Sequence, residues 1–215
     1  MMTLYGYFRS STSYRTRIAM NLKQLDYDYV AVNLAQDEQL EATFQAINPQ
    51  GLVPVLQVDD LWLYQSPSIL EWLEEVYPEH PLLPKDAAAR MHVRALSAMI
   101  GCDIHPLNNR RILQYLRNEL DVDEAKVMEW CQRWMSEGFI ALEKRLAQDK
   151  NRGKFCYGDS PTFADCYLIP QVSSARRFKV DLSAYPNIVA IDAHCRTLKA
   201  FSDADPMMQP DAPSV

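Results

Sequence analysis

The sequence lacks several features that would place it in other classes of protein. No apolar run approaches the ~18 residues of a membrane span, and the N-terminal MMTLYGYFRS lacks the basic and apolar regions of a signal peptide. No basic run offsets the formal net charge of −6, so nonspecific nucleic-acid binding is not expected. These absences predict a soluble, cytoplasmic protein that has neither a membrane nor a nucleic acid as partner.

Cysteine is present in a number and spacing that exclude two further classes. The five cysteines are an odd count and none lies in Cys-x-x-Cys, so neither a disulfide framework nor a zinc knuckle fits. His80, His92 and His194 show no metal-ligand spacing, and no metal site is expected. What the chain does have, 48% hydrophobic and 23% charged residues, is typical of a globular protein with a sizeable core.

The first part of the chain mixes strand and helix patterns. Its apolar periodicity predicts the order β-α-β-α-β-β-α, which is typical of a thioredoxin-like domain. In the first helix Ile18, Ala19 and Leu22 form one apolar face, and Arg15 and Arg17 lie off it. The predicted strands are 3–7, 27–33, 53–58 and 61–64, and the predicted helices are 13–23, 38–47 and one that opens at Ser66-Pro67.

The second part shows helical periodicity only. Helices are predicted over 87–117, 122–148, 162–176 and 187–200, and the tail after Phe201 is expected to lie against the surface or fray. The stretch 78–86 carries three prolines in seven residues and reads as a stiff linker. The predicted fold is therefore an α/β N-terminal thioredoxin-like domain, residues 1–80, followed by an all-α C-terminal domain, residues 87–215.

The turn between the first strand and the first helix holds hydroxyl groups where a redox thioredoxin carries cysteines. It reads Arg9-Ser10-Ser11-Thr12-Ser13, so dithiol chemistry is excluded there. Hydroxyl donors and unpaired N–H groups at a helix N-terminus favour a bound anion and would stabilise a thiolate. Simple N-capping of the helix is the alternative interpretation, and this turn alone does not decide between them.

Two further stretches suggest a peptide-like ligand that carries a thiol. Leu52-Val53-Pro54-Val55 places a proline where a cis peptide would leave the Val53 backbone free to pair with an extended ligand, although an ordinary strand-edge proline is the alternative. Tyr64-Gln65-Ser66-Pro67 offers an amide, a hydroxyl and backbone N–H groups at a second helix start, which suits a carboxylate. Glutathione has a thiol, a peptide backbone and carboxylates, and it fits this description.

The whole chain resembles the zeta class of glutathione transferases, which includes maleylacetoacetate and maleylpyruvate isomerases. The resemblance implies the glutathione transferase fold and a homodimer. It rests on stretches that run from the first strand almost to the C-terminus: FRSSTSYRTRIAMNLK, NPQGLVPVL, YQSPSILEWLEE, CDIHPLNNRRILQYL, YGDSPTFADCYLIPQV and ARRFKVDLSAYPNI.

The same resemblance implies roles for individual residues. Ser10, with Ser11 beside it, matches the serine that assists the glutathione thiolate, and Thr12 stands where many members of the class have cysteine. Arg9 and Arg177 are implied to act with these residues in catalysis. The residues implied to bind glutathione, in addition to Ser10 and Thr12, are Gln39, Gln50, Val53, Pro54, Gln65 and Ser66 of the first domain and Asp103, His105 and Asn109 of the helical domain.

The implied activity is glutathione-dependent cis–trans isomerisation of maleylacetoacetate or maleylpyruvate in the breakdown of aromatic compounds and tyrosine. The thiolate would add to the cis double bond and leave again after rotation, so glutathione would be a cofactor that is recovered. Candidate clamps for the negative ends of such a cis-enedioic keto acid are Arg9, Arg110, Arg111 and Arg177. Adjacent helical residues diverge by ~100°, so only one of Arg110 and Arg111 is expected to face the substrate.

Two other functions fit the same motifs. One is a zeta-like transferase that conjugates or dehalogenates small electrophiles, and the other is a catalytically silent module that binds glutathione. Arg9 and Arg177 suit the two acidic ends of an isomerase substrate, which argues against the first alternative. The presence of Ser10, Gln65 and Ser66 argues against a catalytically silent module. The sequence does not decide between the two isomerase substrates.

Overall fold

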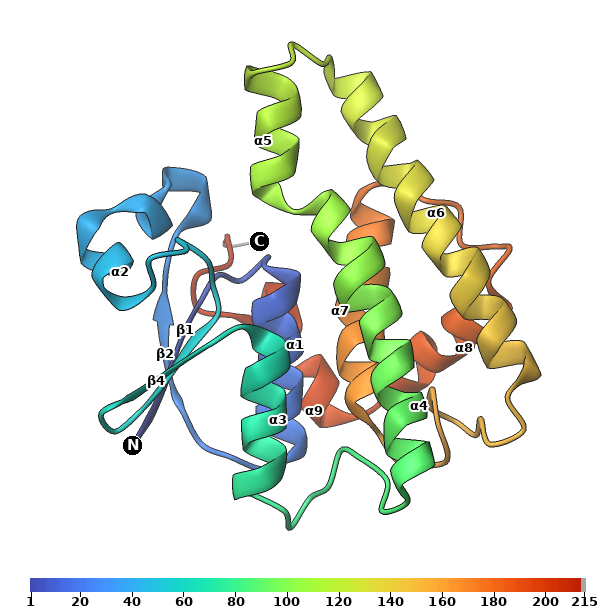
Figure 1. Ribbon diagram of the computed structural model, residues 1–215. Coiled ribbons are helices and arrows are strands. Elements are labelled where there is room, and N and C mark those ends of the chain that lie inside the picture. Colours follow the sequence, from blue (N-terminus) through green and yellow to red (C-terminus); the bar gives the residue numbers. More distant parts are fainter. Residues whose placement is uncertain (214–215) are drawn as a thin grey trace. The chain divides into compact units, whose positions relative to one another are not determined.

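A mixed sheet lies at the centre of the first part of the chain. The computed structural model, which describes residues 1–213, contains four strands in the order β2-β1-β3-β4. Strand β1 pairs in parallel with β2 and antiparallel with β3, and β3 pairs antiparallel with β4. The strands are β1 (Met2–Gly6), β2 (Asp28–Ala31), β3 (Val55–Val58) and β4 (Leu61–Tyr64) (Figure 1).

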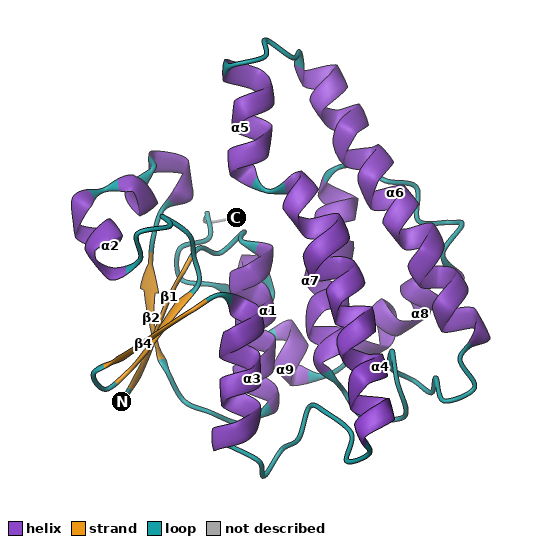
Figure 2. Cartoon of the chain, viewed as in Figure 1, coloured by secondary structure: helices purple, strands orange, loops and turns teal. Residues whose placement is uncertain are grey.

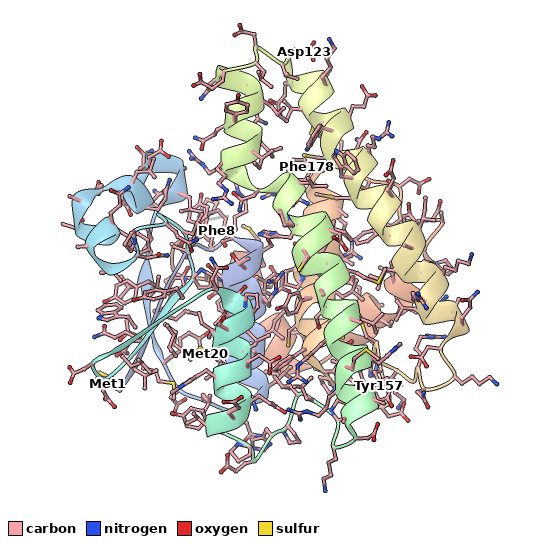
Figure 3. All side chains as sticks on the ribbon, in the orientation of Figure 1. Met1, Phe8, Met20, Asp123, Tyr157 and Phe178 are labelled. Carbon is pink, nitrogen blue, oxygen red and sulfur yellow. The ribbon has the colours of Figure 1, made fainter. Side chains whose placement is uncertain are left out.

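Helices cover both faces of this sheet because successive side chains of a strand point to opposite faces. Leu4 of β1 and Leu56 of β3 pack with Met20, Ile69 and Leu73, which come from helices α1 (Ser11–Leu22) and α3 (Ser66–Val76). Figure 3 labels Met20 in this apolar layer. The predicted order β-α-β-α-β-β-α and the thioredoxin-like layout are confirmed.

The opposite face carries a second apolar cluster. Val55 of β3 packs there with Tyr7, Val32, Phe44 and Val53. Phe44 belongs to α2 (Ala42–Ile47), which follows two short 3₁₀ turns, η1 (Leu34–Gln36) and η2 (Glu38–Leu40). The predicted single helix over 38–47 is therefore two elements.

The end of the chain belongs to the same compact unit as the sheet. Met1–Leu82 and residues 196–213 cluster together, whereas the expected domains were 1–80 and 87–215, of which residues 214–215 lie outside the described part. The tail includes α9 (Lys199–Ser202) and the 3₁₀ turn η5 (Pro206–Met208). Phe201 and Ala204 are fully buried, so the tail is part of the core of this unit rather than a fraying end.

The second unit, Leu83–Cys195, consists of helices, and all the strands lie in the first unit (Figure 2). The region predicted as one helix over 87–117 is interrupted. Its parts are α4 (Ala87–Ala98), the π-helical turn η3 (Met99–Ile104), the 3₁₀ turn η4 (His105–Asn108) and α5 (Arg110–Asn118). The remaining helices are α6 (Glu124–Gln148), α7 (Phe163–Arg177) and α8 (Pro186–Cys195).

The i, i+3/i+4 spacing of Val127, Cys131, Trp134, Gly138, Leu142 and Leu146 predicts the core-facing stripe of α6, and the structure confirms its two ends but not its middle. Val127, Cys131, Leu142 and Leu146 are buried as predicted, but Met135 and Phe139 replace Trp134 and Gly138 as the buried positions between them. Within residues 1–213, none of the helices combines the length and apolar character that crossing a membrane requires.

Candidate functional site

The first turn of the protein is held by hydrogen bonds within its own backbone and by hydrogen bonds to two serine side chains. The Ser10 N–H donates to the Tyr7 carbonyl at 3.0 Å, and the Ser13 hydroxyl accepts from the Tyr7 N–H at 3.4 Å. Ser10 Oγ accepts from the Ser13 N–H at 3.2 Å and caps α1. The N-cap interpretation of this turn is therefore confirmed. Because the cap uses an oxygen lone pair, the hydroxyl proton of Ser10 is available for a second bond.

A chain of hydroxyl groups fixes where that proton points. Thr12 Oγ1 donates to the Val53 carbonyl at 3.0 Å and lies 3.0 Å from Ser10 Oγ. Since the single proton of Thr12 is used on Val53, the Ser10 hydroxyl must be the donor in the contact between the two side chains. Ser10 is therefore the hydroxyl of this pair that can turn its proton towards an incoming anion.

Thr12 joins the first turn to the segment that precedes β3. The Val53–Pro54 peptide bond is cis, as the sequence suggested, and both residues are buried. Asn48 shapes the approach to this segment, because its side-chain amide donates to the Leu52 carbonyl at 2.8 Å. Gly51 has φ +60°, and a Cβ there would lie 3.0 Å from the Gln39 carbonyl oxygen, so only glycine fits this close approach.

Gln39 is brought to the same segment and carries an unsatisfied atom. The residue is 6% exposed, and its Nε2 donates to Asp37 at 3.1 Å. Its Oε1 is buried and has no hydrogen-bond partner among residues 1–213. A buried acceptor of this kind is uncommon in proteins and indicates a missing donor, such as an N–H of a bound ligand.

The start of α3 brings the two predicted glutamines together. Gln65 has φ +65°, a conformation uncommon for residues other than glycine, and its Nε2 donates to Gln50 Oε1 at 2.6 Å. No side chain of the described chain caps α3 from its N-cap position, so the N–H groups of the first helical turn can receive an anion. Ser66 is buried and its Oγ accepts from Arg15 at 2.9 Å.

Two buried arginines of α1 lie close to the site and have no signal in the sequence pattern. Arg15 and Arg17 were placed off the apolar face, but both are buried, and Arg17 is fully inaccessible. Burial lowers the pKa of Arg17 from its usual value, because desolvation disfavours the charged form. Their partners are a serine from a distant helix and backbone carbonyls, and helical periodicity gives no signal for either.

The predicted glutathione ligands of the helical unit lie on the segment between α4 and α5. Asp103 is exposed on η3, and His105 is half-buried at the start of η4. Asn109 caps α5, its side-chain oxygen accepting from the Arg111 N–H at 3.1 Å. Arg110 is half-buried and Arg111 is exposed, so the two arginines differ as adjacent helical residues should.

The other two candidate arginines are exposed: Arg9 lies in the turn before α1, and Arg177 is the last residue of α7. In the first unit, the Arg9 guanidinium carbon lies 5.9 Å from the Phe8 ring centroid. In the helical unit, that of Arg177 lies 4.7 Å from the Phe178 ring centroid. Arg176 instead pairs with the buried Asp192 at 2.5 Å, which gives it a structural role.

Two of the buried cysteines, Cys131 and Cys156, have thiols whose pKa is raised, which disfavours the thiolate. Burial raises the pKa of Cys131 to about 11, with Arg177 and Arg117 acting in the opposite direction. Cys156 lies between α6 and α7 and is buried, and burial raises its pKa well above the ordinary value. A thiolate at the first turn would therefore have to come from a ligand, since the turn itself has no cysteine.

Comparisons with known proteins agree with this arrangement. The family model of the glutathione S-transferase N-terminal domain matches residues 9–76, and that of the C-terminal domain matches residues 135–191. The chain is 56% identical over 211 residues to a maleylpyruvate isomerase from Ralstonia sp, which covers 98% of this chain and 100% of that protein.

Solved structures give the same result. The holo structure of a bacterial maleylpyruvate isomerase, described as a zeta-class glutathione S-transferase, has a TM-score of 0.97 and 56% identity, and covers 98% of this chain and 100% of its own. A maleylacetoacetate isomerase from Methylobacterium extorquens, solved with malonate and glutathione bound, has a TM-score of 0.96 and 37% identity, over 99% and 100% of the two chains. The chain belongs to the glutathione S-transferase family, and within it to the zeta class.

Proposed function

We propose that the protein is a glutathione-dependent cis–trans isomerase that acts on maleylacetoacetate or maleylpyruvate. The observation that carries the proposal is the hydroxyl chain Ser10–Thr12–Val53 at the start of α1, which leaves one proton to donate and provides no thiol. Relatives with these two activities in their names cover almost the whole chain. Glutathione fits as the cofactor because the turn needs a thiol that it does not itself contain.

Several groups of the first unit suit a peptide that carries a thiol. Val53 offers its backbone N–H, which donates to no acceptor among residues 1–213, for pairing with an extended ligand. The buried Gln39 Oε1 offers an acceptor for an N–H of the ligand. The Gln50–Gln65 pair and the N-terminus of α3 at Ser66 offer donors for a carboxylate. These residues would bind the backbone and the charged ends of glutathione.

Ser10 is proposed as the residue that keeps the ligand thiol ionised. Glutathione, when bound, supplies the thiolate that adds to the cis double bond of the substrate and leaves after rotation. The Ser10 hydroxyl would donate to that sulfur and stabilise its charged form, as would the N-terminal end of α1, with Ser11 its first residue. Thr12 would hold the Ser10 hydroxyl in place, since its own proton is used on Val53.

Arginine side chains are proposed to bind the carboxylates of the substrate. Arg9 directly precedes the serine of the first turn, and Arg177 ends α7. A guanidinium group binds a carboxylate through two parallel hydrogen bonds and would also stabilise negative charge that develops during the reaction. Arg110 and Arg111 at the start of α5, and Asp103, His105 and Asn109 before them, are proposed as further residues of the helical unit that contact substrate or glutathione.

Two further proposals concern the oligomeric state of the protein and its location in the cell. We propose a homodimer because the zeta class forms dimers, and a cytoplasmic location because all five cysteines of the chain are free and the cytosol maintains a glutathione pool. Neither proposal affects the residues assigned above.

The experiment compares isomerisation of maleylpyruvate and maleylacetoacetate, followed spectrophotometrically with and without glutathione, for the wild type and two arginine variants. We expect turnover only with glutathione, and a loss of about 10²-fold or more in kcat/KM for Arg177→Ala, because a donor to a developing charge is lost. Arg133→Ala is the matched control, since Arg133 is an exposed arginine of the same unit paired with Glu137.

Each outcome has a defined meaning. The better substrate identifies the pathway. Turnover on neither substrate, with glutathione still bound, would favour a conjugating transferase or a silent glutathione-binding module. If Arg177→Ala and Arg133→Ala have equal activity, Arg177 is not a substrate ligand.

A further inference from the structure

The backbone of the first turn is hydrogen-bonded to two side chains that have no role in the proposed chemistry. The N–H of Phe8, two residues before Ser10, donates to Asp211 Oδ2 at 2.8 Å. The carbonyl of Phe8 accepts from Arg17 Nη2 at 3.0 Å. Both polar backbone groups of this residue, labelled in Figure 3, are thus bound by side chains that are distant in sequence.

Both of these side chains depend on the C-terminal tail, residues 196–213. Asp211 is itself in the tail, and it also accepts from the Tyr29 hydroxyl at 3.4 Å. Arg17 Nε donates to the tail carbonyl of Ala204 at 3.0 Å. The tail can be followed in Figure 1 to the region where α1 begins.

The tail is fixed firmly enough to act on the turn. Phe201 and Ala204 are fully buried in it, and Asn21 of α1 donates to the Ala200 carbonyl at 3.0 Å. Arg196 and Asp205, at 3.2 Å, form an ion pair within the tail. Local segments with this degree of burial and hydrogen bonding do not open easily.

Arg17 and Asp211 also lie close enough to interact electrostatically. Arg17 is fully buried, and burial lowers its pKa, whereas the neighbouring Tyr29, Tyr27 and Asp211 act in the opposite direction. Oδ1 of Asp211 is buried and has no hydrogen-bond partner among the described residues, so this carboxylate oxygen is shielded from solvent. Because the two side chains bind the N–H and the carbonyl of the same residue, Phe8, loss of either one would disturb the segment that the other holds.

We infer that the C-terminal tail is a positioning element for the glutathione site, and that Asp211 and Arg17 are positioning residues that act through the Phe8 backbone on Ser10. The inference rests on the proposed function in taking Ser10 as the donor to the thiolate. Small displacements of a donor are costly in catalysis, since a misplacement of about 1 Å can reduce a rate by about 10²-fold. The tail would thus set the thiol pKa of bound glutathione without touching it.

The experiment compares Asp211→Ala and Asp211→Asn with a matched control, Asp203→Asn. Asp203 is in the same tail and carries the same charge, but its carboxylate pairs with Lys199. Three quantities are measured alongside the melting temperature: hydrogen exchange of the backbone amides in residues 7–14 without glutathione, the thiol pKa of bound glutathione from thiolate absorbance, and kcat/KM.

We expect Asp211→Ala to accelerate exchange of the Phe8 region at least about tenfold and to raise the bound thiol pKa by about one unit, which is about tenfold less thiolate. Asp211→Asn keeps an oxygen that can accept from the Phe8 N–H, so it should fall between Asp211→Ala and the wild type. Asp203→Asn should match the wild type in all three measurements.

The inference is overturned if Asp211→Ala matches Asp203→Asn in both exchange and thiol pKa. It is also overturned if Asp211→Ala lowers only the melting temperature, because that is the result of a purely structural role. Failure of the proposed function gives a different result, in which glutathione bound to the wild type is not ionised. The exchange measurement, made without glutathione, then still decides whether the tail holds the turn.

Discussion

Ser10 can cap a helix and stabilise a thiolate because the two roles use different parts of one hydroxyl group. The oxygen accepts from the Ser13 N–H, and the proton points towards Thr12. The two interpretations that the sequence left open are therefore compatible. The structure shows why Ser10 is the donor in its contact with Thr12, because the Thr12 proton is used in the hydrogen bond to the Val53 carbonyl.

Replacing Ser10 by alanine should separate these two roles. We expect Ser10→Ala to raise the thiol pKa of bound glutathione and to lower kcat about 10²-fold, because a donor to the developing charge is lost. Loss of the cap should lower the free energy of unfolding by about 1 kcal/mol. Ser10→Thr, which keeps a hydroxyl and a capping oxygen, is the control. A kcat for Ser10→Ala within about threefold of the wild type would assign the thiolate to another donor.

Single buried polar residues were the hardest feature to predict. The motifs around Ser10, Val53 and Gln65 could be found in the sequence because each sits at an element boundary, where special residues are needed. Arg15 and Arg17 could not be found, because a 3.6-residue period describes apolar faces and contains no information about a carbonyl from the tail.

The π-helical turn η3 is the element that distinguishes the helical unit from a plain bundle. It follows α4 without a break and carries Asp103, with His105 directly after it. Asn108 stabilises the end of this region, its amide donating to the Ile104 carbonyl at 2.8 Å. Such turns are frequent at functional sites, where they redirect side chains that a regular helix would place elsewhere.

Gly138 of α6 determines how closely this turn packs. A Cβ at Gly138 would lie 2.3 Å from Ile104 Cγ1 and 2.4 Å from its Cδ1, so either the buried Ile104 side chain must change its rotamer within the packed core or the turn must move. Gly138→Ala adds about 1 kcal/mol of helix propensity, but overpacking of a core costs about 1–3 kcal/mol, so the net effect should be destabilising.

Chemical denaturation and steady-state kinetics measure both consequences. We expect Gly138→Ala to lower the free energy of unfolding. We also expect it to change KM for the substrate or for glutathione, because η3 carries Asp103 and leads directly into His105. Glu137→Ala, at the exposed neighbouring position, is the control and should cost no more than about 1 kcal/mol. A more stable Gly138→Ala variant would show that the turn yields easily.

Elements with regular patterns were predicted well, and elements with interruptions were not. The succession of strands and helices along the first unit follows from periods of 2 and 3.6, and a capping box formed by Thr162 and Asp165 begins α7. The break between α4 and α5 was missed because the apolar pattern continues through η3, and hydrogen bonding by Asn108 and Asn109 decides the geometry instead.

For the whole molecule, sequence order and spatial order differ at the C-terminus. The expected division placed the tail with the helices that precede it, whereas residues 196–213 cluster with the sheet. The tail carries Phe201, which is fully buried, and Asp211, which binds the first turn. Nothing in a local pattern says which of two cores a short apolar segment will join, so this assignment requires the three-dimensional structure.

The central claim is that glutathione is a recovered cofactor rather than a consumed substrate. The most direct measurement is isomerisation of the better substrate in large excess over glutathione, with both the trans product and free glutathione quantified by chromatography. A glutathione-dependent isomerase converts all of the substrate and returns all of the glutathione, because the thiolate leaves at the end of each turnover. A reaction that stops when the glutathione is exhausted, with a thioether accumulating in equal amount, would contradict the claim and identify a conjugating transferase.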